Sequence, residues 1–246
     1  MRIDLNADLG EESGDDAAIF PCISSANIAC GAHAGGARAI DAALAQAAAL
    51  GVTVGAHVGY DDRANFGRIA VDIDKQALTA SITQQIERLM EHAARFGLTV
   101  QYVKPHGALY HRVGADPSQA AALVAATLTC DPALELLVPL SPVLLAEAEA
   151  LRCRHEFFAD RGYRLDGQLV ARTDPRAHVD DVAAVVERTM LWLTTGEVRS
   201  VEGKSIRILA DSICLHGDSA FAVETARELR RALEAAGYRI ANWMAA

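Results

Sequence analysis

Short extended segments alternate with longer amphipathic segments along the chain. The clearest helix is predicted over 74–96, where apolar residues recur at three- and four-residue steps and Gly97 ends the pattern. Further helices are predicted over 36–50, 118–128, 142–150, 179–193 and 220–236. Extended runs predict strands over 2–8, 25–30, 52–56, 99–103, 134–139, 153–159 and 212–215, with a short terminal strand over 238–240.

Repeated strand-then-helix units imply a parallel sheet with right-handed crossovers. About seven such units in 246 residues predict an α/β fold whose sheet closes, or nearly closes, into a barrel. An open doubly wound sheet is the alternative that the pattern also allows. The sequence contains no linker-like or low-complexity stretch, so we expect residues 1–246 to form a single domain.

Composition narrows the class of protein. The formal net charge is −9 and no run of Lys and Arg occurs, which argues against nucleic acid as a partner. No uninterrupted apolar stretch is long enough to span a bilayer, and acidic residues stand where a signal peptide needs an apolar run. The five cysteines include no CxxC pair, as in a chain with reduced thiols. We therefore expect a cytoplasmic protein that binds neither nucleic acid nor a membrane.

A polar motif follows nearly every predicted strand. These motifs are Asn6–Glu11, Asn27–His33, Gly55–His57 with Asp61–Arg68, Lys104–Gly107, Asp160–Arg161 and His216–Asp218. The carboxyl ends of parallel strands share one face of an α/β barrel, and that face holds the active site. Taken alone, Asp8 is typical of a turn-bonding carboxylate, and His57 fits a core histidine and a functional histidine equally well. Together, the motifs predict one shared polar cleft.

Several common chemistries are excluded by the motifs. Residues 31–36 lack the glycine spacing of a dinucleotide fingerprint, and no HExxH or GxSxG motif occurs. Gly203-Lys204-Ser205 resembles the end of a phosphate loop, but Val198 occupies the position of its first glycine. The remaining histidines, carboxylates, lysine and arginines suit general acid–base hydrolysis of a small polar molecule. They equally suit a divalent metal held by Asp and His, and the spacing does not separate the two.

Six long motifs resemble those of the LamB/YcsF family. They read IDLNADLGE at 3–11, SANIACGAHAG at 25–35, GAHVGYDDRANFGR at 55–68, VKPHGALYHRV at 103–113, FADRGYRLDGQLVAR at 158–172 and DSICLHGD at 211–218. These blocks run in family order across nearly the whole chain, and each is long and rich in uncommon residues.

The resemblance implies an irregular seven-stranded (β/α) barrel, similar to that of polysaccharide deacetylases. It also implies a component of an ATP-dependent 5-oxoprolinase, which opens 5-oxoproline to glutamate with separate B and C subunits. Ring opening must be coupled to an energy source. The amine and carboxyl groups of the product are held at high effective concentration, which favours the closed ring. ATP can supply the energy by activating the lactam oxygen as a phosphate. The missing phosphate loop fits partners that help to bind ATP.

Within the motifs we assign catalytic roles to Asp8, Glu11, His57, Lys104, His106 and His216. We assign substrate-binding roles to Asn6, Asn27, His33, Arg68, Asp160, Arg161, Arg172 and Asp218. Lys104 or Arg161 would hold the substrate carboxylate or a phosphate. His57, His106 or Asp8 would take a proton from the attacking water.

Two other functions remain open. A stand-alone metal-dependent amidohydrolase or deacetylase would be active without ATP. By analogy of fold with the deacetylases, Asp8, His33 and His57 could hold its divalent metal. A non-catalytic scaffold subunit would instead leave turnover unchanged when cleft residues are mutated. The density of ionisable residues in the motifs favours an enzyme over a scaffold.

Overall fold

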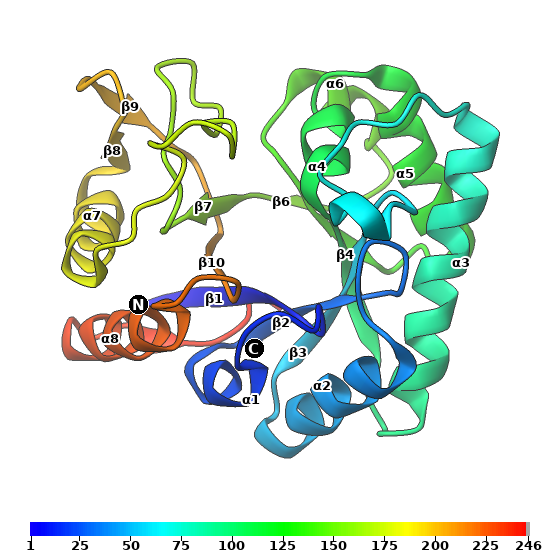
Figure 1. The fold of residues 1–246 in the computed structure, drawn as a ribbon, viewed down its shortest axis with the longest axis horizontal. Coiled ribbons are helices and arrows are strands. Elements are labelled where there is room, and N and C mark those ends of the chain that lie inside the picture. Colours follow the sequence, from blue (N-terminus) through cyan, green and yellow to red (C-terminus); the bar gives the residue numbers. More distant parts are fainter. Residues whose placement is uncertain (245–246) are drawn as a thin grey trace.

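A parallel β-sheet rolled into a nearly closed barrel forms the centre of the structure (Figure 1). The computed structural model describes residues 1–244. Neighbouring strands follow the order β6-β5-β4-β3-β2-β1-β10-β7. Their bounds are Arg2–Leu9 (β1), Ser25–Ala29 (β2), Thr53–Val58 (β3), Val100–Pro105 (β4), Glu135–Leu137 (β5), Cys153–Arg154 (β6), Glu156–Phe158 (β7) and Ser212–His216 (β10). The predicted barrel of parallel strands is confirmed, and the short terminal strand β11 (Arg239–Ile240) pairs with the start of β1.

The barrel closes through a strand that breaks in the middle. The sequence predicts one strand over 153–159, whereas the structure contains two, β6 and β7, separated by His155. β6 pairs with β5 at one edge of the sheet, and β7 pairs with β10 at the other. The backbone N–H of His155 donates to the Asp211 side chain at 3.0 Å rather than to a neighbouring strand, which accounts for the break. Counted as one broken strand, β6 and β7 complete the seven strands that the family resemblance implies.

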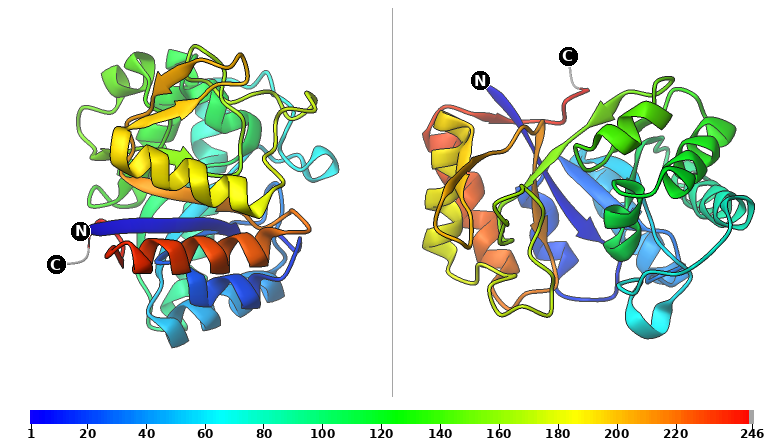
Figure 2. Two further views of the ribbon diagram at one scale, coloured as in Figure 1. Left: turned by 90° about the vertical axis from the view of Figure 1, so that its left-hand side faces the viewer. Right: turned by 90° about the horizontal axis from the view of Figure 1, so that it is seen from above.

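Helices cover the outside of the barrel. Figure 2 shows α7 and α8 side by side on one flank, with α3 and α5 on the opposite flank. The six predicted helices correspond to α2 (Ala37–Leu50), α3 (Lys75–Ala94), α5 (Pro117–Cys130), α6 (Pro142–Glu147), α7 (Val182–Thr195) and α8 (Ala222–Ala235). The sequence did not predict the short elements α1 (Asp16–Ile19), α4 (Gly107–Val113) and the 3₁₀ helices η1 (Phe20–Cys22) and η2 (Arg63–Asn65). Within residues 1–244, no helix combines the length and apolar character needed to cross a bilayer.

The longest helix, α3, follows from its local sequence signals. The Asp74 side chain accepts a hydrogen bond from the Ala77 backbone N–H at 3.0 Å and so caps the first turn. Leu78, Ile82 and Leu89 recur on one face and are fully buried. This face packs against α5 and the strands β3 and β4. Because β3 and β4 pair in parallel, the loops after both strands lie at one end of the barrel.

The Gly203-Lys204-Ser205 stretch belongs to a hairpin. β8 (Glu197–Arg199) and β9 (Ser205–Arg207) pair in antiparallel register, and Gly203 adopts a φ of 82° in the turn between them. A phosphate loop instead leads from a strand directly into a helix. This stretch therefore lacks phosphate-loop geometry, as the sequence predicts.

Candidate active site

Six predicted site residues lie inside barrel strands rather than in the loops after them, and the first of them is Asn6 on β1. Asp8 on β1 pairs in register with Asn27 on β2 and with His216 on β10. His57 on β3 pairs with Lys104 on β4. All six are at least nine-tenths buried. Because residues paired in register point to the same face of a sheet, these side chains meet at the carboxyl end of the barrel interior.

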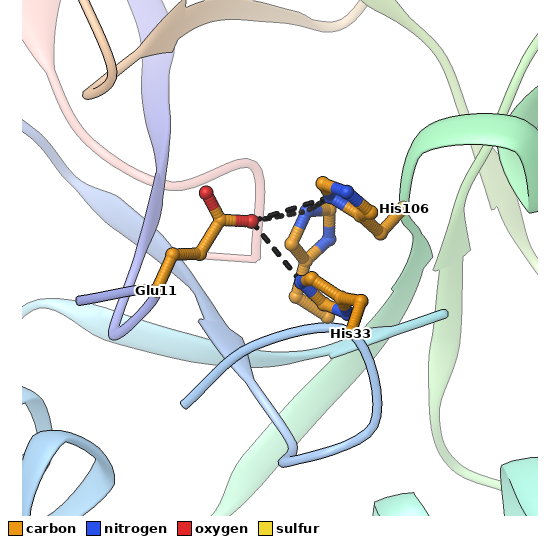
Figure 3. A group of neighbouring side chains, drawn as sticks. Glu11, His33 and His106 are labelled. Carbon is orange, nitrogen blue, oxygen red and sulfur yellow. Dashed lines mark hydrogen bonds and ion pairs between the residues drawn. The ribbon is translucent and has the colours of Figure 1, made fainter. Parts of the chain in front are cut away.

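Glu11, His33 and His106 reach the same place from the loops after β1, β2 and β4, and Figure 3 shows them pointing toward one another. Glu11 Oε1 lies 3.1 Å from His33 Nε2 and 3.2 Å from His106 Nδ1. The His33 and His106 rings are stacked, with centroids 3.8 Å apart. His57 Nε2 lies 3.6 Å from the same Glu11 oxygen. These four residues are called the His–Glu cluster below.

Backbone carbonyl groups determine the tautomers of two cluster histidines. His57 Nδ1 donates to the Lys104 carbonyl oxygen at 3.2 Å, and His106 Nε2 donates to the Phe66 carbonyl oxygen at 2.9 Å, since a carbonyl only accepts. In neutral rings the other two nitrogens, His57 Nε2 and His106 Nδ1, carry lone pairs, yet they face each other at 2.9 Å. Two lone pairs at this distance repel, and the carboxylate beside them adds negative charge. The arrangement requires a cation there, either a proton or a metal ion.

Burial and hydrogen bonding set the charges of the cluster. Burial alone would raise the pKa of Glu11, but the His106 and His33 rings beside its Oε1 hold that pKa well below its usual range, so the carboxylate is ionised. Burial lowers the pKa of His33 to about 3 and also lowers the pKa of His106. Both rings are therefore neutral at pH 7. His33 Nδ1 is buried and has no hydrogen-bond partner among the described residues.

The cluster has the donor set of a transition-metal site. Four buried residues offer ligand atoms that all lie within 4.8 Å of one another: Glu11, His33, His57 and His106. Imidazole nitrogens with one carboxylate suit zinc, iron or manganese. The ligand set expected from the sequence was Asp8, His33 and His57. In the structure Asp8 lies beside the cluster, with its Oδ2 3.3 Å from His57 Nε2.

A buried lysine holds Asp8 in place. Lys104 Nζ lies 2.8 Å from Asp8 Oδ1, 2.9 Å from Glu156 Oε2 and 3.3 Å from Cys214 Sγ. Burial alone would lower the pKa of Lys104, but Asp8, Cys214 and Glu156 raise it well above its ordinary value. The ammonium group is charged, buried and surrounded by protein partners, so it orients Asp8. Sequence reasoning missed Glu156, whose signal was a lone acid within an apolar strand.

The side chains of Asn6 and Asn27 form hydrogen bonds with other protein side chains. The Asn27 amide donates to Asp8 Oδ1 and to Asn6 Oδ1, both at 2.7 Å. The Asn6 amide donates to Ser212 Oγ at 2.7 Å, and Tyr102 donates to Asn27 Oδ1 at 2.6 Å. Both asparagines are fully buried. The structure therefore places them behind Asp8, where they orient its carboxylate.

His216 and Asp160 form a carboxylate–imidazole pair. His216 Nδ1 lies 3.0 Å from Asp160 Oδ1, and the His216 backbone N–H donates to Asp160 Oδ2 at 2.9 Å. Burial raises the pKa of Asp160, but the charge and hydrogen bonds of His216 outweigh it and lower that pKa. Donation from Nδ1 leaves a lone pair on His216 Nε2, which lies 4.0 Å from Asp8 Oδ2. An imidazole oriented in this way can act as a general base.

Asp8 and His216 also belong to a second potential metal-ligand group. Their ligand atoms and the Cys214 sulfur lie within 4.8 Å of one another. Burial raises the pKa of the Cys214 thiol well above its ordinary value. The neutral thiol makes this group a poorer cation site than the His–Glu cluster.

Arg68, Arg172 and Asp218 lie at the outer side of the site. Asp218 Oδ2 is 2.7 Å from Arg68 Nη2 and 3.4 Å from Arg172 Nη1. The side chain of Arg68 is 37% exposed, that of Arg172 is 25% exposed and that of Asp218 is 23% exposed. Arg161, in contrast, is buried and donates to two backbone carbonyl groups of its own loop, at 2.9 and 2.7 Å. Arg161 therefore stabilises the loop, whereas the side chains of the two other arginines are partly exposed.

Glycine allows two loops to meet at the cluster. Gly67 adopts a φ of +61°, and a Cβ atom there would lie 2.8 Å from His33 Cβ. Its carbonyl oxygen accepts a hydrogen bond from the Ala108 backbone N–H at 3.0 Å. Because the two loops approach so closely, the carbonyl oxygen of the neighbouring Phe66 accepts a hydrogen bond from His106 Nε2.

Fold and site together describe an α/β barrel protein with an imidazole–carboxylate centre at the carboxyl ends of its strands. The chain belongs to the LamB/YcsF family, whose model matches residues 3–246. It is 47% identical over 241 residues to the 5-oxoprolinase A subunit numbered 3 of Pseudomonas syringae pv. tomato. The aligned region covers 95% of this chain and 94% of that protein. It is 44% identical to the 5-oxoprolinase A subunit numbered 1 of Agrobacterium fabrum, over 98% of this chain and 97% of that protein.

The fold matches that of a solved structure with clear sequence similarity. The crystal structure of a lactam utilization protein from Thermus thermophilus superimposes with a TM-score of 0.91 and 38% identity, over 98% of this chain and 99% of that one. A family 4 carbohydrate esterase from Streptomyces lividans aligns with a TM-score of 0.49 and 12% identity, over 99% and 93% of the two chains. This second likeness is too distant to inform the chemistry.

Proposed function

We propose that this chain is the A subunit of an ATP-dependent 5-oxoprolinase, which hydrolyses the lactam of 5-oxo-L-proline to L-glutamate. Relatives named as A subunits of 5-oxoprolinase match it over nearly their whole length. The observation that carries an enzymatic role is the buried His–Glu cluster, because a scaffold has no need of four converging donor atoms in its barrel.

We assign activation of the attacking water to the Asp160–His216 pair. His216 Nε2 takes a proton from water, while Asp160 holds the ring by Nδ1 at 3.0 Å. The water attacks the lactam carbonyl carbon, and the bond from that carbon to the ring nitrogen then breaks. The departing nitrogen takes up a proton as it becomes the amino group of glutamate.

The His–Glu cluster is the proposed electrophilic centre. Glu11, His33, His57 and His106 would hold a divalent metal, and their converging lone pairs fit that role. Such a metal would polarise the lactam carbonyl or acidify a water molecule. Asp8 Oδ1 accepts hydrogen bonds from Lys104 and Asn27, and Asp8 Oδ2 lies 3.3 Å from His57 Nε2, so Asp8 forms one edge of this centre.

ATP and two partner subunits complete the proposed reaction. Transfer of the ATP γ-phosphoryl group to the lactam oxygen, with release of ADP, would drive ring opening. Attack of the first water and cleavage of the bond to nitrogen would then leave an acyl phosphate, which a second water hydrolyses to the glutamate carboxylate and inorganic phosphate. We expect the B and C subunits to help bind ATP, since Gly203 lies in a hairpin turn. The proposal places the chain in the cytoplasm, where ATP is available, and its five cysteines are free thiols. We also propose that the chain is one domain, since most of its buried apolar residues belong to one cluster.

The test is glutamate release from 5-oxoproline, measured with this chain alone and with B and C subunits, each with and without ATP. We expect release only from the complete mixture with ATP. Release by the lone chain without ATP would show a stand-alone amidohydrolase instead. Unchanged release by a complete mixture in which this chain carries cleft substitutions would show a scaffold.

A further inference from the structure

We propose that Arg68 and Arg172 form a clamp for a ligand carboxylate, and that Asp218 occupies this clamp in the free protein. Two arginines more than a hundred residues apart in sequence converge on one oxygen, at 2.7 and 3.4 Å from Asp218 Oδ2. The inference rests on the proposed function, because it assigns the carboxylate of 5-oxoproline as the ligand group.

The two arginines are the cations left available at the site. Lys104 is buried against Asp8 and Glu156, and Arg161 donates to carbonyl groups of its own loop. In the described part of the chain, the side chains of Arg68 and Arg172 each hydrogen-bond only to Asp218. A guanidinium group has five N–H donors in a fork that matches a carboxylate, so both retain donors for a ligand.

The clamp connects the His–Glu cluster with the Asp160–His216 pair. The Arg68 guanidinium lies 4.8 Å from the centre of the Phe66 ring, and the Phe66 carbonyl oxygen accepts from His106 Nε2. Asp218 follows His216 by two residues in the loop after β10. A ligand held at the clamp therefore lies next to both the His–Glu cluster and the Asp160–His216 pair.

The chemistry of 5-oxoproline fits this position. Its carboxylate and its lactam carbonyl lie on opposite sides of the ring nitrogen, so anchoring the carboxylate at the clamp directs the carbonyl inward. Asp218 carries the same functional group and is a partly exposed internal substitute for it. Two arginines against one aspartate leave one positive charge in excess, on a chain whose net charge is −9. That excess attracts an anion and is screened by salt.

The experiment is calorimetric titration of the full chain with three probes: 5-oxoproline, 2-pyrrolidinone, which is the same lactam ring without a carboxylate, and inorganic phosphate. Arg172→Gln should weaken 5-oxoproline binding by at least about tenfold and leave 2-pyrrolidinone unchanged. Arg172→Lys should weaken 5-oxoproline binding less than Arg172→Gln, because lysine keeps the positive charge but not the forked N–H donors of a guanidinium group.

Asp218→Asn should tighten 5-oxoproline binding, because it removes the carboxylate that competes with the ligand for the two arginines. Arg176→Gln is the matched control, because Arg176 pairs with Asp174 on the same loop and is 59% exposed.

Specific outcomes would overturn the clamp. These are equal binding of 5-oxoproline and 2-pyrrolidinone to the wild type, absence of 5-oxoproline binding, or loss of binding in Asp218→Asn. Phosphate binding that depends on Arg172 while 5-oxoproline binding does not would assign the clamp to a phosphate and overturn the carboxylate assignment. Turnover by the assembled subunits tests the proposed function separately, so the two failures are distinguishable.

Discussion

His57 Nε2 and His106 Nδ1 lie 2.9 Å apart, although the carbonyl groups that bind the opposite ring nitrogens leave neither of them a proton in the neutral state. The Glu11 carboxylate faces the same point from 3.2 and 3.6 Å. A cation there removes the repulsion between these atoms, and its binding energy would add to the stability of the folded barrel.

We expect the chain to bind one equivalent of a divalent transition metal at the cluster. At a free metal concentration one hundred times Kd, linkage adds about 2.7 kcal/mol to the free energy of unfolding. Calorimetric Tm should rise with zinc or manganese in the wild type but not in Glu11→Gln or His57→Gln. Glu202→Gln, at an exposed site, is the control. No metal uptake and no change in Tm would mean that a shared proton is the cation.

The Asp160–His216 pair should control turnover in the assembled complex. His216→Gln removes the proposed proton acceptor and should lower kcat by about 10²–10⁴. The chain has a matched control, because His92 Nδ1 pairs with Asp41 Oδ1 at 2.6 Å on the outside of the barrel. His92→Gln should leave kcat unchanged. Equal kcat values for the two variants would remove His216 from the chemistry.

Asp4 should make stability fall as pH rises. It accepts hydrogen bonds from Ser24, Ser25 and Ser212, yet burial raises its pKa from 3.8 to about 6. Between those values the folded state binds more protons than the unfolded state, so the free energy of unfolding decreases with pH across this window. The loss is on the order of 3 kcal/mol. Asp4→Asn should remove this slope in urea denaturation at pH 4 to 6.5; an unchanged slope would assign it to other groups.

Gly67→Ala should disturb the cluster, whereas Gly51→Ala should not. Both glycines have left-handed φ values, +61° and +67°, so each substitution should cost about 1 kcal/mol or more of stability. Only at Gly67 would the new Cβ meet another side chain, His33, at 2.8 Å, while nothing lies within 4 Å of the site at Gly51. Turnover and metal binding should fall only in Gly67→Ala. Equal losses in both variants would refute this coupling.

The strands and main helices followed from sequence because their signals are local. Apolar periodicity places the buried face of α3, and Asp74 and Gly97 mark its ends. The shared face of the polar motifs followed from the parallel sheet, since carboxyl ends of parallel strands meet.

What the sequence did not reveal depends on long-range hydrogen bonds. The break at His155 arises from the Asp211 side chain, 56 residues away. The sequence predicts that Arg161 or Lys104 holds the substrate. In the structure Arg161 donates to carbonyl groups of its own loop, and Lys104 forms ion pairs with Asp8 and Glu156. The motifs predict substrate-binding roles for Arg68 and Arg172 as well as for Arg161. Only the structure distinguishes them, because the Arg68 and Arg172 side chains are partly exposed whereas Arg161 donates to carbonyl groups of its own loop.

The most direct test of the account is ATP-dependent glutamate release from 5-oxoproline by the assembled subunits, with wild type compared with His106→Ala. The account predicts that turnover is abolished in the variant, while circular dichroism and assembly with the partners are retained. Normal turnover by a folded His106→Ala variant would contradict the claim that the His–Glu cluster is the catalytic centre.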